Sequence, residues 1–157
     1  MSNKYVSYDE AVQKLESYCA YQERCHQEVH QKLKDLGIFG EDIDQITAHL
    51  IENNYLNELR FATLFAGGRF RIKKWGRIKI KLALKQKRIS EYCIKKALQT
   101  EIPEEDYYQT LLQVLEKKDR TLREPNAYKY KQKLARYAQE RGFESPLVWS
   151  VINDLYA

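Results

Sequence analysis

The side chains best able to do chemistry in this sequence are basic, and they are concentrated in one segment. Residues 69–96 contain twelve lysines and arginines against a single acidic residue, Glu91, so this segment carries a net charge of +11. The rest of the chain has fifteen basic and twenty-one acidic residues, a net charge of −6. Charge segregated in this way predicts a surface that binds a polyanion, either a nucleic-acid backbone or an acidic groove on a protein.

Part of the basic segment recurs at helical spacing and predicts a stripe along one face of a helix. The stripe consists of Arg77, Lys81, Lys85 and Arg88. Ile80 and Leu84 fall on the other side of the same helix and are expected in the core. The alternative is an ordinary solvated lysine face, but the near absence of acidic residues favours binding.

The wider candidate site adds residues that flank the stripe and a second group nearer the C-terminus. The predicted binding residues are Arg69, Arg71, Lys73, Lys74, Trp75, Arg77, Lys81, Lys85, Arg88, Lys129, Lys133 and Arg136. Trp75 and Tyr92 could stack on bases, although a tryptophan at a helix start more often packs against its neighbours. The last three residues form a secondary contact surface, because the tyrosines and the leucine between them are expected to point inward.

Other reactive side chains do not combine into a catalytic or metal site. His26 and His30 are one helical turn apart and Cys25 is adjacent, but a zinc site needs a fourth ligand at a suitable spacing. We therefore interpret the two histidines as solvent-facing and Cys25 as half-buried. Gly67-Gly68 and the residues after it lack the ending of a phosphate-binding loop, and no nucleophile elbow appears. We expect a protein that is not an enzyme and needs no metal or cofactor.

The segments that position these residues are predicted to be helices. Six glycines and three prolines in 157 residues are too few for the frequent turns of an all-β protein. Apolar residues instead recur at helical spacing along the whole chain. We predict an all-α, elongated and curved molecule of three tandem three-helix repeats. The repeats are expected at residues 1–56, 57–101 and 102–157, with the basic segment in the second.

Local signals predict where several helices begin and end. Ser7 opens a capping box at the start of the first helix, and Gly37 is placed to end the second in a left-handed conformation. The Gly67-Gly68 pair is expected to kink or end the fourth helix. The fifth helix is expected to begin near Trp75, and the eighth at Pro125.

The cysteines and the N-terminal segment bear on the location of the protein. Cys19, Cys25 and Cys93 are an odd number at irregular spacing, which is not typical of a disulfide framework. The first residues lead into an amphipathic stretch without a long apolar run. We therefore expect reduced thiols and a cytoplasmic protein.

Three motifs that fall on predicted helices resemble the RecX family. They are Asn54-Tyr55-Leu56-Asn57-Glu58-Leu59-Arg60-Phe61-Ala62, Gly76-x3-Ile80-x3-Leu84-x3-Arg88-Ile89 and Glu28-Val29-x3-Leu33-x3-Gly37-Ile38. The last two also repeat one another in phase, as an internal repeat requires. Asn54 and Arg88 stand where the family pattern has glycine. The resemblance extends over essentially the whole chain.

This resemblance implies three three-helix repeats and a role in regulating the RecA recombinase. A RecX protein is expected to bind the RecA filament on single-stranded DNA and to restrain its recombination and ATP hydrolysis, in DNA repair and the SOS response. The resemblance implies no cofactor and no catalytic centre. We also expect weak binding of duplex DNA, no membrane contact and a monomer.

The residues themselves leave a second reading open, a stand-alone helical DNA-binding module that acts without RecA. Three-helix units are similar to helix-turn-helix domains, and the basic fifth helix could enter a major groove. Lysine outnumbers arginine in residues 69–96, and asparagine and glutamine are few there. That composition favours contact with the backbone over reading of bases.

Overall fold

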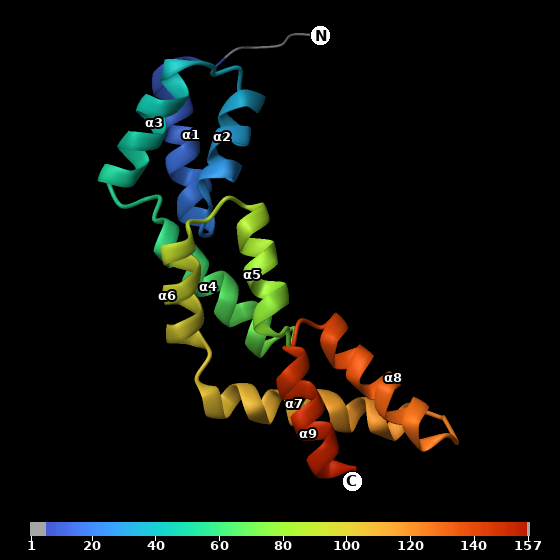
Figure 1. Cartoon of the computed structure of the whole chain (residues 1–157). Helices are drawn as coiled ribbons and strands as arrows, with labels where there is room; N and C mark the ends of the chain where they lie inside the picture. The colour runs from blue at the N-terminus through green and yellow to red at the C-terminus, as the bar shows by residue number, and fades with distance from the viewer. Residues whose placement is uncertain (1–5, 157) are drawn as a thin grey trace, which may run out of the picture.

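The computed structural model describes residues 6–156, and every regular element within that range is an α-helix. The helices are α1 (Tyr8–Tyr21), α2 (His26–Asp35), α3 (Glu41–Glu52), α4 (Glu58–Arg71), α5 (Arg77–Gln86), α6 (Glu91–Glu101), α7 (Glu104–Thr121), α8 (Ala127–Glu140) and α9 (Ser145–Leu155). Figure 1 shows α1–α3 at one end of a long molecule, α4–α6 in the middle and α7–α9 at the other end. The predicted all-α repeat fold is confirmed. No helix in the described range is long and apolar enough to cross a bilayer.

Helices α1–α3 close around a core of their own. The Ser7 hydroxyl accepts a hydrogen bond from the Glu10 amide at 3.2 Å, as the capping box predicts. Gly37 follows the end of α2 with a φ of +83°, a conformation that glycine adopts without steric cost. The buried side chains are Ala11, Leu15, Cys19, Val29, Leu33, Ile38, Ile43, Ile46, Leu50 and Leu56. Apolar residues at helical spacing on three helices thus explain this unit.

Helices α4–α9 share one continuous core. Tyr107 on α7 stands between two aromatic rings, with centroid distances of 6.0 Å to Phe70 and 5.1 Å to Phe143. Ile80 and Leu84 on α5 are fully buried in the same core, on the side where the sequence places them. Cys25, between α1 and α2, also reaches it and is fully rather than half-buried. The middle and C-terminal helices therefore pack as one body.

The glycine pair does not end α4, which continues to Arg71. A Cβ atom on Gly67 would lie 2.3 Å from the Arg71 guanidinium and 2.5 Å from a carboxylate oxygen of Glu101. These two side chains form a 3.1 Å ion pair over Gly67. The ion pair between α4 and α6 therefore passes directly over the Gly67 backbone.

Two helices begin later than the sequence predicts. α5 begins at Arg77 rather than near Trp75, because Lys74 is left-handed with a φ of +56° and Gly76 is the N-cap. α8 begins at Ala127 rather than at Pro125. The Asn126 side chain accepts a hydrogen bond from a backbone amide of its first turn and caps the helix there.

Candidate polyanion-binding surface

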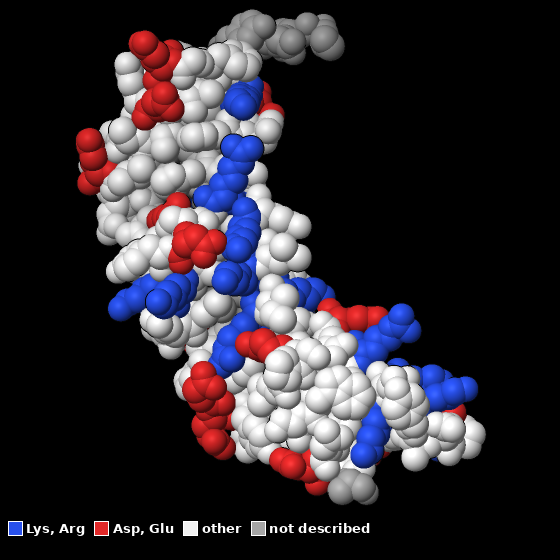
Figure 2. Space-filling model, viewed as in Figure 1, with Lys and Arg blue, Asp and Glu red and all other residues white. Residues whose placement is uncertain are grey.

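The predicted stripe lies along α5 and the turn that follows it. Figure 2 shows lysine and arginine side chains in a line over α5 on the viewed face of the molecule. Lys81, Lys85 and Arg88 are all exposed. Successive positions on one helix face are about 6 Å apart along the axis, so the cations form a row of neighbouring charges. The local helix brings these three predicted residues together.

Arg77 begins the same row but is held by the protein itself. Its guanidinium contacts Glu104 at 2.8 Å and Glu144 at 3.1 Å, and lies 3.8 Å from the centroid of the Tyr107 ring. Only 25% of its side chain is exposed. Burial lowers the pKa of Arg77, but hydrogen bonds to the two carboxylates outweigh it and raise the pKa above its ordinary value. The main role of Arg77 is therefore to link α5 to the starts of α7 and α9, and its charge is largely neutralised.

The remaining cations on this face differ in whether an acidic partner neutralises them. Lys85 contacts Glu91 at 3.3 Å, in a pair whose side chains are 47% and 73% exposed. Exposed pairs of this kind contribute little to stability and exchange readily with another anion. Within residues 6–156, Lys81, Arg88 and Lys95 make no ion pair. These three are the charges most available to a ligand.

A groove between α5 and α6 runs beside the row of cations. Its volume is about 620 Å³. Tyr92, which is 70% exposed, stands on one wall, and Leu98 and Ile102 contribute apolar surface. Lys81 and Lys95 line it as well. The helical spacing of α5 alone could not reveal this groove, since α6 and the start of α7 complete it.

The other side of α5 carries aromatic rings covered by cations. Arg69 lies 4.4 Å from the centroid of Phe65 and 5.5 Å from that of Trp75, and Lys79 lies 4.5 Å from that of Trp75. Trp75 is half-buried and packs against the shared core. The structure therefore places Arg69 and Trp75 on the α4 side, away from the row that contains Lys81. Stacking of Trp75 on a base would displace cations that already lie over its ring.

The other predicted residues are scattered. Arg71 is paired with Glu101 between α4 and α6, and Lys73 and Lys74 occupy the turn before α5. The α8 residues are exposed, and two of them are paired, Lys133 with Glu124 at 2.6 Å and Arg136 with Glu140 at 3.5 Å. The turn after α8 hydrogen-bonds to the start of α5 through the Arg141 and Gly142 carbonyls, and Lys129 lies about 18 Å back from it along the α8 axis. The structure does not bring α8 into the α5 row.

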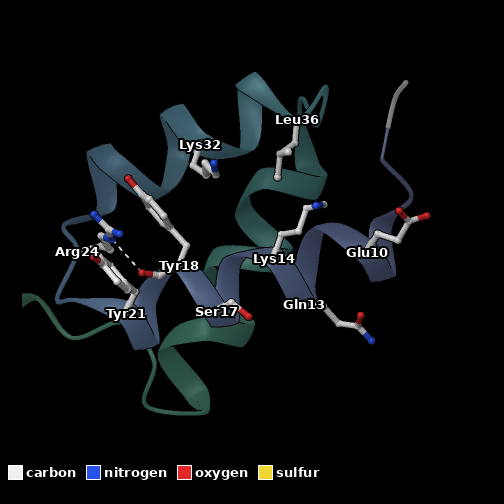
Figure 3. Close-up of a pocket in the computed structure, with 9 residues that line it drawn as sticks. All are labelled: Glu10, Gln13, Lys14, Ser17, Tyr18, Tyr21, Arg24, Lys32 and Leu36. Carbon is white, nitrogen blue, oxygen red and sulfur yellow. Dashed lines mark hydrogen bonds between the residues drawn. The ribbon is translucent and has the colours of Figure 1, made fainter. Parts of the chain in front are cut away.

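A larger hollow of about 780 Å³ lies along α1 and α2 (Figure 3). At one end the Arg24 guanidinium stacks 3.6 Å from the centroid of Tyr18 and donates a hydrogen bond to the Tyr18 carbonyl at 2.9 Å. Lys32 faces the same ring from α2 at 5.4 Å. These contacts hold the connection between α1 and α2, so the hollow is a structural part of the first unit. In residues 6–156, no three potential metal ligands come together.

Comparison with known families identifies two segments of the chain. A model of the second three-helix domain of RecX matches residues 57–98, and a model of the third three-helix domain of RecX matches residues 104–152. Together the two segments make up more than half of the chain. They contain α4–α6 and α7–α9 respectively, apart from a few terminal residues.

Curated relatives match over most of the chain. The regulatory protein RecX of Bacillus cytotoxicus is 27% identical over 96% of this chain and 57% of its own length. Those of Lactobacillus johnsonii and Clostridium perfringens are 30% and 31% identical over 92% and 84% of this chain, and over 53% and 62% of their own lengths. This chain thus spans a little over half the length of these relatives.

Solved structures share the fold. The crystal structure of RecX from Lactobacillus salivarius superposes with a TM-score of 0.84 at 22% identity, over 94% of this chain and 96% of that one. A second crystal structure, of a regulatory protein RecX, gives the same TM-score at 24% identity, over 94% of this chain and 73% of that one.

Proposed function

This chain belongs to the RecX family, and we propose that it binds the RecA filament on single-stranded DNA and modulates, mainly inhibits, its ATP hydrolysis and recombinase activity. The protein acts in this proposal by binding, without a reaction or cofactor of its own. The observation that carries the proposal is the exposed row of cations on α5. Three charges in and beside this row have no acidic partner among the described residues: Lys81 on α5, Arg88 in the turn after α5, and Lys95 on α6.

The chemistry of the row suits phosphate groups. Phosphate contacts come mainly from lysine and arginine and fix position without reading sequence. The cations of α5 stand on a buried support, since Ile80 and Leu84 hold this helix in the core behind them. The row can therefore meet a backbone without rearrangement of the helix, which reduces the entropic cost of binding.

The length of the molecule supports contact with several subunits of a filament at once. In the proposal, residues 1–56, 57–101 and 102–157 are three units, and the central one faces DNA or an acidic edge of the filament groove. The end units, including Lys129, Lys133 and Arg136 on α8, supply protein contacts. Several weak contacts made by one chain give a much higher combined affinity than any of them alone. A monomer is sufficient for this arrangement.

The test is ATP hydrolysis by RecA on single-stranded DNA, titrated with this protein, with binding to free DNA measured at the same salt. We expect inhibition at near-stoichiometric amounts, under conditions where free DNA is barely bound. The double variant Lys81→Gln/Lys95→Gln should inhibit less. The matched control Lys14→Gln/Lys117→Gln removes the same charge from exposed positions on α1 and α7 and should inhibit normally.

The contrary result has a definite meaning. Unchanged ATP hydrolysis together with tight binding of free DNA would overturn the proposal and favour a DNA-binding module that acts without RecA. Equal inhibition by the two double variants would mean that Lys81 on α5 and Lys95 on α6 do not contact the filament.

A further inference from the structure

A second cationic hollow lies where the first unit meets the second. It has a volume of about 350 Å³ and lies between α2 and the turn that joins α5 to α6. Its lining residues are His26, Gln27, His30, Gln31, Lys34 and Arg88. The α2 residues among them fall on one side of the helix because they are three or four positions apart. A hydrogen bond of 3.4 Å from the Gln27 side chain to the Gln86 carbonyl ties the two walls together.

Arg88 occupies an unfavourable backbone conformation in this hollow. Its φ is +61°, a left-handed conformation that is unfavourable for a residue with a Cβ atom and that glycine adopts without steric cost. The side chain is exposed and makes no ion pair or hydrogen bond with any residue in the described range. This conformation closes α5, because it lets the Ile89 amide donate to the Leu84 carbonyl at 3.1 Å. It also leaves a long cation in the hollow that is available to an anion.

The other groups in the hollow suit an anion with several acceptor oxygens. Lys34 makes no ion pair within residues 6–156, and Gln27 and Gln31 carry amide donors. Three acidic side chains lie near. Asp35 accepts a hydrogen bond from Gln31 at 2.9 Å, and Glu58 accepts one from the Ser90 hydroxyl at 2.7 Å. The negative charge of Asp44, on α3, raises the pKa of His30. None of these acids is among the residues that line the hollow, whose two charged lining residues are Lys34 and Arg88, so the lining itself is cationic.

The histidines make the charge of the hollow depend on pH. Burial and the charge of His26 lower the pKa of His30, Asp44 opposes them, and Lys34 lowers it further. An anion bound among these groups would favour the protonated imidazole and raise the same pKa. Binding of an anion should therefore weaken as the pH rises and His30 loses its proton.

We propose that the hollow formed by α2 and Arg88 binds a phosphate group of a single-stranded nucleic acid that follows α5. Arg88 is the last member of the α5 row and the only second-unit residue that lines the hollow, so the row continues onto the first unit through it. The surface that contacts the strand then extends from Lys81 on α5 to Lys34 on α2, which lies outside the basic segment of residues 69–96. The inference rests on one part of the proposed function, the binding of a single-stranded nucleic acid, and does not require inhibition of RecA.

The test uses NMR of the full-length chain, which contains three histidines. We expect a short oligothymidylate to shift the ring signals of His26 and His30 and to raise the pKa of His30. His49 is the internal reference, because it lies on α3 at 2.9 Å from Glu16, outside the hollow, and its signals should not move. An oligonucleotide with uncharged methylphosphonate linkages should leave all three histidines unchanged.

Substitutions at Arg88 separate binding from folding. Arg88→Gly removes the guanidinium and relieves the backbone, so it should shift the urea midpoint of unfolding to a higher concentration. It should also weaken oligothymidylate binding about tenfold, the effect of one charge-assisted hydrogen bond. Arg88→Lys should retain part of the affinity. Lys14→Gln, which removes one charge on α1, should bind normally.

Several outcomes would overturn the inference. Wild-type affinity of Arg88→Gly with unmoved His26 and His30 signals would do so, even if the Lys81→Gln/Lys95→Gln variant still lost inhibition of RecA. Equal shifts with the methylphosphonate strand would rule out a phosphate contact. Saturation by inorganic phosphate at micromolar concentration would identify a site for the free ion, and shifts with an acidic peptide but not with DNA would identify a protein partner.

Discussion

The backbones of Gly76 and Gly142 lie in direct contact although 66 residues separate them in the chain. The Gly76 amide donates to the Arg141 carbonyl at 2.7 Å, and the Ile78 amide donates to the Gly142 carbonyl at 3.0 Å. A Cβ atom on Gly76 would lie 2.2 Å from the Gly142 carbonyl carbon. This contact fixes the start of α5, and with it the row of cations, against the turn between α8 and α9.

The first prediction concerns this contact. Gly76→Ala should lower the free energy of unfolding by about 1–3 kcal/mol, because the neighbouring atoms are backbone and cannot move aside. Gly68→Ala is the matched control, since a Cβ atom there meets nothing within 4 Å. In mid-helix that change should raise the free energy of unfolding by about 0.5–1 kcal/mol. Urea denaturation of both variants measures the difference, and equal stabilities would contradict the close approach.

The second prediction concerns Arg77 as a link between units. Arg77→Gln should cost about 1–2 kcal/mol of stability, a value reduced because its side chain and that of Glu144 are 25% and 33% exposed. A double-mutant cycle with Glu144→Gln should give a coupling energy clearly above zero. The exposed pair Arg136–Glu140 is the reference and should couple by less than about 0.5 kcal/mol. If the two cycles agree, Arg77 is an ordinary surface cation.

The third prediction concerns the salt dependence of DNA binding. Each phosphate contact on a single strand contributes about 0.7 to the slope of log affinity against log salt. Lys81→Gln/Lys95→Gln should therefore reduce the magnitude of the slope by about 1.4, and Lys14→Gln/Lys117→Gln should leave it unchanged. Fluorescence anisotropy with an oligothymidylate at several salt concentrations provides the slopes. Identical slopes would mean that neither α5 nor α6 touches phosphate.

The fourth prediction concerns the pH dependence of stability. Burial raises the pKa of the Cys19 thiol from 9.0 to about 11. Between these values the thiol ionises in the unfolded chain but stays protonated in the folded one, so ionisation favours unfolding. The free energy of unfolding should fall as the pH rises from 9 towards 11. The decline should be smaller in Cys19→Ala, which lacks this thiol, and a parallel decline in both proteins would assign the effect to other groups.

Helix periodicity was enough to predict several features that the structure confirms. The spacing of Ile80 and Leu84 placed them in the core, and the capping box at Ser7 identified the start of α1. The glycine-like positions of Asn54 and Arg88 in the repeated motifs both have positive φ angles. Such features depend on residues within one or two helical turns, and a local pattern contains that information.

Tertiary contacts decided the roles of individual residues. The sequence placed Arg77 in the same row as Lys81, but its partner Glu144 lies 67 residues away and neutralises it. Likewise His26 meets Arg88 in one hollow only because the first unit docks beside the α5–α6 turn. Periodicity specifies which face of a helix is buried, but not which distant side chain packs there. The sequence by itself therefore determined the helices and the basic segment. Only packing decided which charges are neutralised and which remain free to bind.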